Sequence, residues 1–126
     1  MTTADIGDVD MGRGLDTTPI PLLEQIRSQG RVWEDLAAQY GVTNPDPPWK
    51  VNLEGICDAL SAEACALPVL ERRYEEDELS EDLYADVPYP ERQLLALAHS
   101  LIRRGVVDEA ELETRMKQVH ERLTRI

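Results

Sequence analysis

Apolar residues recur with helical spacing along most of the chain, most clearly in its last third. Over residues 94–102, and again from 112 to 123, they are separated by three or four positions, the period of an amphipathic helix. Gly105 is placed to end the first helix, and Asp108 with Glu111 is typical of a capping box that begins the second. The apolar face of that second helix consists of Leu112, Met116, Val119 and Leu123. No segment alternates with the two-residue period of a strand, so the pattern predicts an all-α fold of helical hairpins.

The middle of the chain predicts two further helices. Pro68 is placed to end the first and suits the first turn of the second, whose inward residues we expect to be Leu70, Tyr74 and Leu79. Ser80, followed by two acids, has the composition of an N-cap for a short turn beyond that helix. Apolar positions with helical spacing in the first of these helices are Val51, Leu53, Ile56, Cys57, Leu60 and Ala64.

The first 48 residues divide into an arm, two short helices and a linker. Residues 1–18 hold three glycines among polar residues, which predicts an irregular, extended N-terminal arm that orders only against a surface. Short helices are expected over 19–29 and 32–40, each followed by a glycine. Three prolines within residues 42–48 predict an extended linker. The expected organisation is an arm over 1–18, short helices and a Pro-rich linker over 19–48, and a helical domain over 49–126.

The charge of the chain argues against several classes of partner. Its 25 acidic and 13 basic residues give a net charge of −12, whereas nucleic acids and anionic membranes require a basic face. No apolar run approaches the ~20 residues that span a bilayer. The N-terminus has no basic start and no apolar core, unlike a secretory signal, so we expect a cytoplasmic protein. With no Phe and only 5% aromatic residues, the core is thin, which favours a partner that completes it.

No catalytic or metal-binding motif stands alone in the sequence. Cys57 and Cys65 would lie roughly 12 Å apart along one helix, too far for a disulfide, and their spacing is not one of metal ligands. His99 and His120 fall on different predicted helices. We therefore expect reduced thiols and neither a metal nor a cofactor held by this chain. A run of acids is interpreted as a solvated helix face, with metal uptake or a basic partner as alternatives; it comprises Glu75, Glu76, Asp77, Glu78, Glu81, Asp82 and Asp86.

From Trp49 to Leu123 the chain resembles the N-terminal helical half of the nitrile hydratase β subunit. It is still more similar to the separate β subunit of thiocyanate hydrolase. The resemblance rests on Trp49 and the helix after it, Glu71-Arg72-Arg73, Pro88-Tyr89, residues 94–105, and VVDEAELETRM at the start of the last helix. One departure is Pro90, where the family often has a second aromatic residue. The family's C-terminal β-barrel half is missing, which implies that it is a separate chain, as in thiocyanate hydrolase and toyocamycin nitrile hydratase.

The resemblance implies a non-metal, β-type subunit of a heteromeric enzyme, a lyase that is inactive as a single chain. In the family, cobalt or iron is held by the α-type subunit on a C-x-x-C-S-C motif with partly oxidised thiolates. The β-type half covers this metal site and lines the substrate pocket. The implied partners are the α-type subunit and a small β-barrel subunit. The implied reaction is hydration of a C≡N group to an amide, or hydrolysis of thiocyanate.

Two site residues are carried over from this resemblance. In the family an Arg of the β-type half donates hydrogen bonds to the oxidised cysteine oxygens, a task that suits the forked guanidinium. By spacing Arg72 matches this residue, with Arg73 as the alternative if the register shifts by one. Both could instead be solvent-facing or paired with the acids that follow. Tyr89 matches a pocket-edge Tyr, or simply packs on the core, and we interpret Trp49 as a packing anchor.

Two other functions are compatible with the sequence. Activator proteins of the same system resemble the same β half but bind the α subunit only transiently, to assist cobalt insertion. An unrelated acidic helical interaction domain would have the same composition. The Arg72 and Tyr89 matches favour the subunit. Nothing in the chain distinguishes nitrile from thiocyanate, or cobalt from iron.

Overall fold

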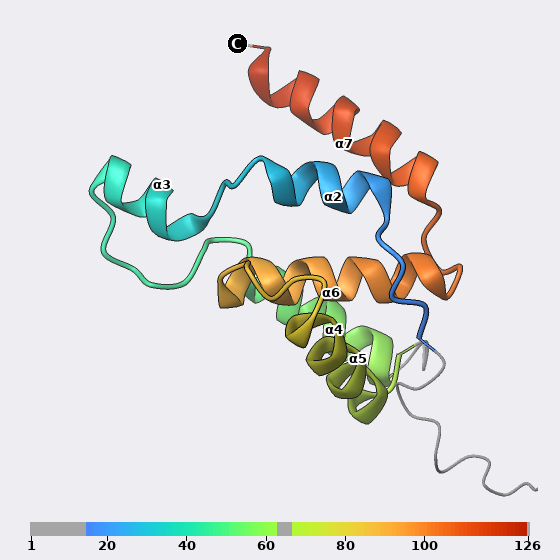
Figure 1. Ribbon diagram of the computed structural model, residues 1–126. Helices are drawn as coiled ribbons and strands as arrows, with labels where there is room; N and C mark the ends of the chain where they lie inside the picture. Colours follow the sequence, from blue (N-terminus) through green and yellow to red (C-terminus); the bar gives the residue numbers. More distant parts are fainter. Residues whose placement is uncertain (1–14, 63–66, 126) are drawn as a thin grey trace, which may run out of the picture.

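The computed structural model describes residues 15–62 and 67–125, which form six α-helices and no strand (Figure 1). The predicted all-α fold is confirmed for these residues. Most of the predicted arm, together with Ala64 and Cys65, lies outside them. The helices are α2 (Pro21–Ser28), α3 (Trp33–Tyr40), α4 (Lys50–Ala62), α5 (Val69–Glu81), α6 (Tyr89–Arg103) and α7 (Glu109–Thr124).

The ends of the helices follow the local signals in the sequence. Gly41 and Gly105 have φ angles of 72° and 77°, in the left-handed region where glycine carries no steric penalty, and they follow α3 and α6. The Asp108 side chain accepts a hydrogen bond from the Glu111 backbone N–H at 3.0 Å, as predicted for the start of α7. The proline-rich residues between α3 and α4 are not helical, as predicted.

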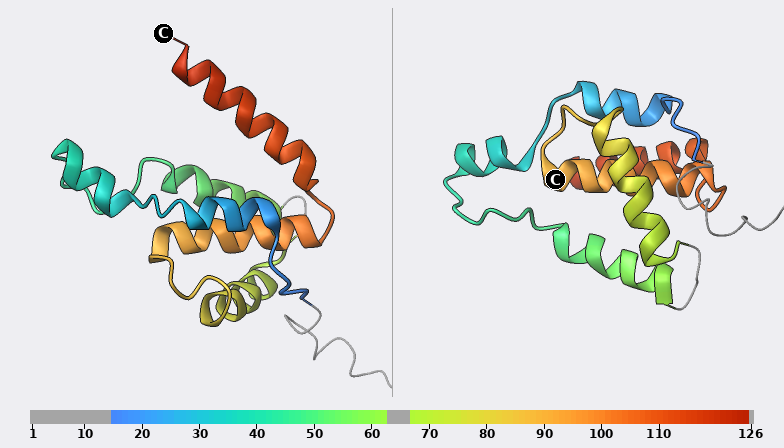
Figure 2. Two further views of the ribbon diagram at one scale, coloured as in Figure 1. Left: turned by 45° about the horizontal axis from the view of Figure 1, so that its top comes forward. Right: turned by 60° about the horizontal axis from the view of Figure 1, so that its bottom comes forward.

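Helix α6 is central to the core, which consists of two clusters along it. In Figures 1 and 2, α6 lies between α2 and α5. Trp49 packs against the second cluster, which fits its interpretation as a packing anchor. The first cluster contains Ile20, Leu23, Leu79, Tyr84, Val87, Leu95 and Ala96. The second contains Leu53, Cys57, Leu67, Leu97 and Leu101. Because Ile20 and Leu23 share a cluster with α6, the segment around α2 packs on the domain predicted from residue 49 onward.

The inward face of α5 is largely polar, contrary to the sequence prediction. Leu70 and Tyr74 are 58% and 52% exposed, and Leu79 alone of the three expected residues is buried. Glu75, only 4% exposed, faces inward instead and pairs with Arg104 at the end of α6. The ion pair satisfies one carboxylate oxygen away from water, which allows α5 to bury this acid.

Two further predictions about α5 need correction. Ser80 does not cap a separate turn, because α5 continues through it to Glu81 while Leu79 anchors the last turn in the core. The acidic run is not one solvated face. Glu75 is buried and Glu76 is half-buried, whereas the run's other members on α5 and in the following turn are exposed.

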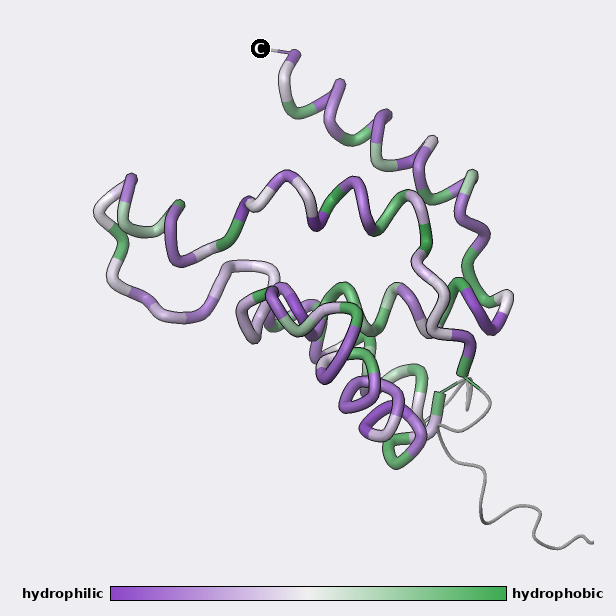
Figure 3. Tube along the Cα trace, in the orientation of Figure 1, coloured by the Kyte–Doolittle hydropathy of each residue, from purple (hydrophilic) through white to green (hydrophobic). Residues whose placement is uncertain are grey.

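Helix α7 extends away from the rest of the molecule, and none of its residues is buried (Figures 1 and 3). One hydrogen bond ties its start to α2, from the Leu22 backbone N–H to the Glu109 carboxylate at 3.0 Å. Met116, Val119 and Leu123, on the predicted apolar face, are exposed. The periodicity therefore identified the helix correctly, but most of this face is exposed in the described structure.

His99 of α6 makes two hydrogen bonds, one to the N-terminal segment and one to the turn between α5 and α6. Its Nε2 donates to the Asp16 backbone carbonyl at 2.8 Å, because a carbonyl can only accept. Its Nδ1 therefore accepts from the Tyr84 hydroxyl, at 2.9 Å. The ring is fully buried, and this burial lowers the pKa of His99, against a smaller opposite effect of the Asp16 carbonyl.

The buried His99 predicts a loss of stability in mild acid. Its pKa is lower in the folded chain than the ordinary value of about 6.5 in the unfolded chain, so below that pH the unfolded state binds more protons. The free energy of unfolding, measured with urea, should therefore fall between pH 7 and pH 5. This fall should be smaller in His99→Gln and unchanged in His120→Gln, a control at an exposed position. Equal pH dependence in wild type and His99→Gln would contradict the assignment.

Candidate functional site

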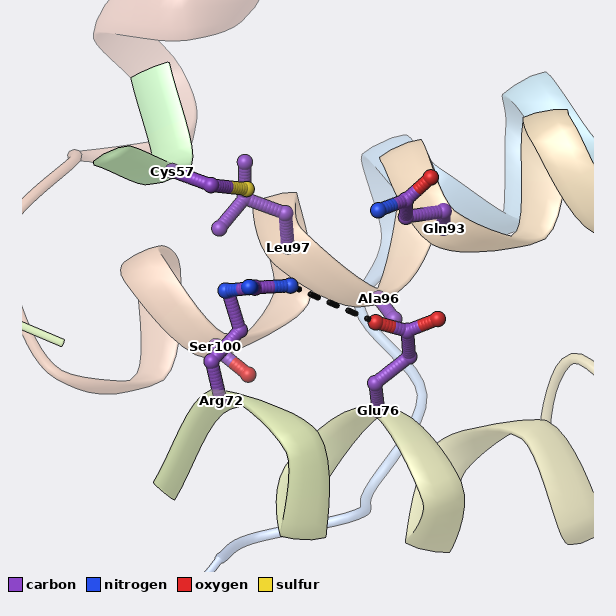
Figure 4. A pocket seen from close by; sticks show the side chains of 7 residues that line it. All are labelled: Cys57, Arg72, Glu76, Gln93, Ala96, Leu97 and Ser100. Carbon is purple, nitrogen blue, oxygen red and sulfur yellow. Dashed lines mark ion pairs between the residues drawn. The ribbon is translucent and has the colours of Figure 1, made fainter. Parts of the chain in front are cut away.

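Arg72 points from α5 toward α6 and does not reach freely into solvent (Figure 4). Its side chain is 19% exposed, and a guanidinium nitrogen lies 3.7 Å from the Glu76 carboxylate, four residues along α5. This ion pair matches the alternative that the sequence leaves open, in which Arg72 pairs with an acid that follows it. The neighbouring charge of Arg72 lowers the pKa of Glu76, but burial outweighs it and raises that pKa overall.

The crevice in front of Arg72 is a packed interior and not a ligand pocket. It has no space for a water molecule. Cys57 of α4 and Leu97 of α6 close it, and burial raises the pKa of the Cys57 thiol. Two buried polar atoms, Arg72 Nε and Gln93 Oε1, have no hydrogen-bond partner there. The thiol is free, as expected, and its raised pKa makes it a poor nucleophile.

Arg73 is exposed and lies about 100° around α5 from Arg72. No ion pair within the described part of the chain engages it. Its neighbours Leu70 and Tyr74, which were expected to face inward, are more than half exposed beside it. Two large apolar side chains and a cation without an ion pair in the described residues are therefore exposed on the same side of the helix, which we call the outer face of α5.

Tyr89, the first residue of α6, is 50% exposed and is held by two cations. The Lys50 ammonium lies 5.3 Å from the centre of its ring, and the Arg92 guanidinium lies 6.0 Å away. Lys50 is in turn paired with the Glu54 carboxylate at 3.1 Å, and this hydrogen bond raises the pKa of Lys50. The ring thus lies at the surface, and its cation–π contacts restrain it.

An open groove of about 470 Å³ lies between α3, the linker and the start of α6, and Tyr89 is not part of its wall. Its wall is mainly apolar, with Trp33, Ala37, Val42, Pro45, Pro88 and Pro90. The Trp33 indole N–H is already used, because it donates to the Asn44 carbonyl at 3.0 Å. The groove is large enough for a partner's side chain or a small ligand.

The residues proposed from the sequence do not converge on one pocket within this chain. Arg72 lines the closed crevice between α5 and α6, whereas Tyr89 lies where α4 and α6 begin. Sequence reasoning missed Lys50 and Arg92. The i, i+4 spacing of Lys50 and Glu54 was a visible signal of their ion pair, but nothing local indicated that Lys50 would reach Tyr89.

Within residues 15–62 and 67–125, no group of His, Cys, Asp and Glu side chains could hold a metal ion. None of the described helices is long and apolar enough to cross a membrane. Large apolar side chains are instead exposed on α5 and α7. These features define the chain as an all-α domain with surfaces suited to a protein partner.

A comparison with protein families identifies this domain. The family described as nitrile hydratase beta subunit, N-terminal, matches residues 10–125. The chain belongs to that family, which confirms the resemblance to the nitrile hydratase β subunit and supports its place in a complex with an α subunit. No curated protein and no solved structure matches the chain.

Proposed function

We propose that the chain is the β-type, non-metal subunit of a heteromeric nitrile hydratase or thiocyanate hydrolase and covers the metal site of the α-type subunit. A separate β-barrel subunit would complete the complex, which we place in the cytoplasm. The observation that carries the proposal is the outer face of α5, in a chain that belongs to the nitrile hydratase β family. There Arg73 is exposed beside Leu70 and Tyr74.

Exposure favours Arg73 over Arg72 as the residue that acts across the interface. A guanidinium that donates to oxygens of another subunit must leave the surface of its own chain. Arg72 would first have to separate from Glu76 and turn out of the crevice, whereas Arg73 already points outward. Apolar neighbours such as Leu70 would exclude water once a partner covers them, and this strengthens a charge-assisted hydrogen bond.

The roles of the α-type subunit and of this chain in the reaction follow from the residues that this chain contains. The described residues hold no ligand set that fits cobalt or iron, so no step is assigned to a metal on this chain. The α-type subunit's metal would supply Lewis-acid activation of the C≡N group or of water. In this proposal Arg73 donates to oxidised cysteine oxygens of the partner, and Tyr89 lies at the edge of the substrate pocket with its hydroxyl as a donor.

Co-expression tests the proposal. The single chain should bind no stoichiometric cobalt or iron and should convert neither acetonitrile nor thiocyanate. With the α-type and β-barrel subunits encoded in the same genome, it should purify as a stable complex that converts one of them. Metal analysis, gel filtration and product assays provide the measurements. A chain that joins the α-type subunit only during cobalt loading is an activator. A chain that never joins it has another function, and either result rejects the subunit role.

A further inference from the structure

The Tyr89 side chain is half exposed, and two cations nevertheless hold its ring in place. Side chains at the first residue of a surface helix ordinarily sample several rotamers, and ordering them costs entropy. Here the ring is half exposed, yet Lys50 and Arg92 both lie within about 6 Å of its centre, the range of a cation–π contact. In the described part of the chain, no hydrogen bond engages the Tyr89 hydroxyl. The ring is therefore held in position, while its hydroxyl makes no hydrogen bond within the described part of the chain.

Lys50 is the better placed of the two cations. It begins α4, so it connects two helices, whereas Arg92 lies only three residues from Tyr89 on α6. Its side chain is 15% exposed, and the Glu54 carboxylate at 3.1 Å fixes the ammonium from the other side. Glu54 thus holds Lys50, and Lys50 in turn holds the ring of Tyr89, whose hydroxyl has no hydrogen bond in the described structure.

We propose that Lys50, supported by Arg92, is a positioning residue that holds the Tyr89 phenol as a preorganised hydrogen-bond donor to the substrate. This inference rests on the proposed function, because the acceptor is the C≡N nitrogen of a nitrile or thiocyanate. A cation beside the ring draws electron density from it and makes the hydroxyl a stronger donor. Prior restraint of the ring also reduces the entropy lost when the substrate binds.

The test uses the reconstituted complex with acetonitrile and thiocyanate as probes. Lys50→Met keeps the length of the side chain and removes its charge, and it should lower kcat/KM about three- to tenfold. Lys50→Arg, which keeps a cation over the ring, should restore most of the loss. The matched control is Lys117→Met, which breaks another i, i+4 pair, with Glu113, on the exposed helix α7. It should leave kcat/KM unchanged.

A double-mutant cycle separates positioning from a merely structural role. In the Tyr89→Phe background, Lys50→Met should cost almost nothing more, because the hydroxyl that it positions is gone. Both single variants should change the same parameter, KM or kcat. Additive losses, or an active complex in which Lys50→Met behaves like Lys117→Met, overturn this inference alone. A complex that is inactive on both probes overturns the proposed function, and this inference with it.

Discussion

Replacing Arg73 by lysine in the reconstituted complex should lower turnover about tenfold to a hundredfold or beyond while the complex still assembles. Lysine keeps the positive charge but lacks the forked N–H donors of the guanidinium, so it cannot donate hydrogen bonds to two acceptor oxygens in the same geometry. A buried charged acceptor left without its partner costs on the order of 1–3 kcal/mol or more. If that loss falls on the transition state, about 1.4 kcal/mol corresponds to each factor of ten in rate. Steady-state kinetics gives the measurement, and gel filtration checks assembly.

Arg72→Lys is the matched control for this experiment, one position away on the same helix. Because Arg72 faces the α5–α6 crevice and pairs with Glu76, its replacement should affect folding stability more than turnover. We expect its rate to stay within about threefold of wild type. A complex that loses activity only with Arg72→Lys would assign the role to Arg72, as the spacing in the sequence first indicated. Normal turnover in both variants would remove the arginine role from this chain.

The helices were predictable because their signals are local. Gly105 follows α6 and Asp108 caps α7, and each lies within one turn of the helix end that it determines. The orientation of α5 was not predictable in this way. Its buried acid, Glu75, depends on Arg104, 29 residues further along the chain. Apolar periodicity alone therefore assigned Leu70 and Tyr74 to the wrong side of the helix.

The candidate site likewise depends on contacts between residues far apart in the sequence, which local signals do not predict. The family resemblance selected the Arg72–Arg73 pair and Tyr89, but only the fold distinguishes an inward arginine from an outward one. Lys50 could not be selected, because its contact with Tyr89 requires the start of α4 to pack near the start of α6. The apolar face of α7 was predicted correctly, and most of it stays exposed in the described structure. Such a face is what a subunit retains for assembly.

Removing the charge of Arg104, the residue that follows α6, should destabilise the fold strongly. The Glu75 side chain is 5% exposed, and its Oε1 already lacks a hydrogen-bond partner, so Arg104 alone pairs with this buried carboxylate in the described structure. In Arg104→Met the carboxylate would lose that partner while it remains buried. Removal of one member of a buried pair costs about 3–5 kcal/mol. We expect about 3 kcal/mol in urea unfolding at pH 7, the lower end, because Arg104 itself is 29% exposed.

Two further variants test whether the stability lost in Arg104→Met comes from the buried Glu75 carboxylate. Arg125→Met removes an exposed arginine from its pair with Glu121 on α7 and should cost less than about 1 kcal/mol. Adding Glu75→Gln to Arg104→Met removes the orphaned charge and should recover part of the lost stability, because a neutral amide is less costly to bury than a carboxylate. If Arg104→Met were no more destabilising than Arg125→Met, Glu75 would have to be solvated in the folded chain. The polar packing of α5 on α6, which turns Arg73 outward, would then lose its support.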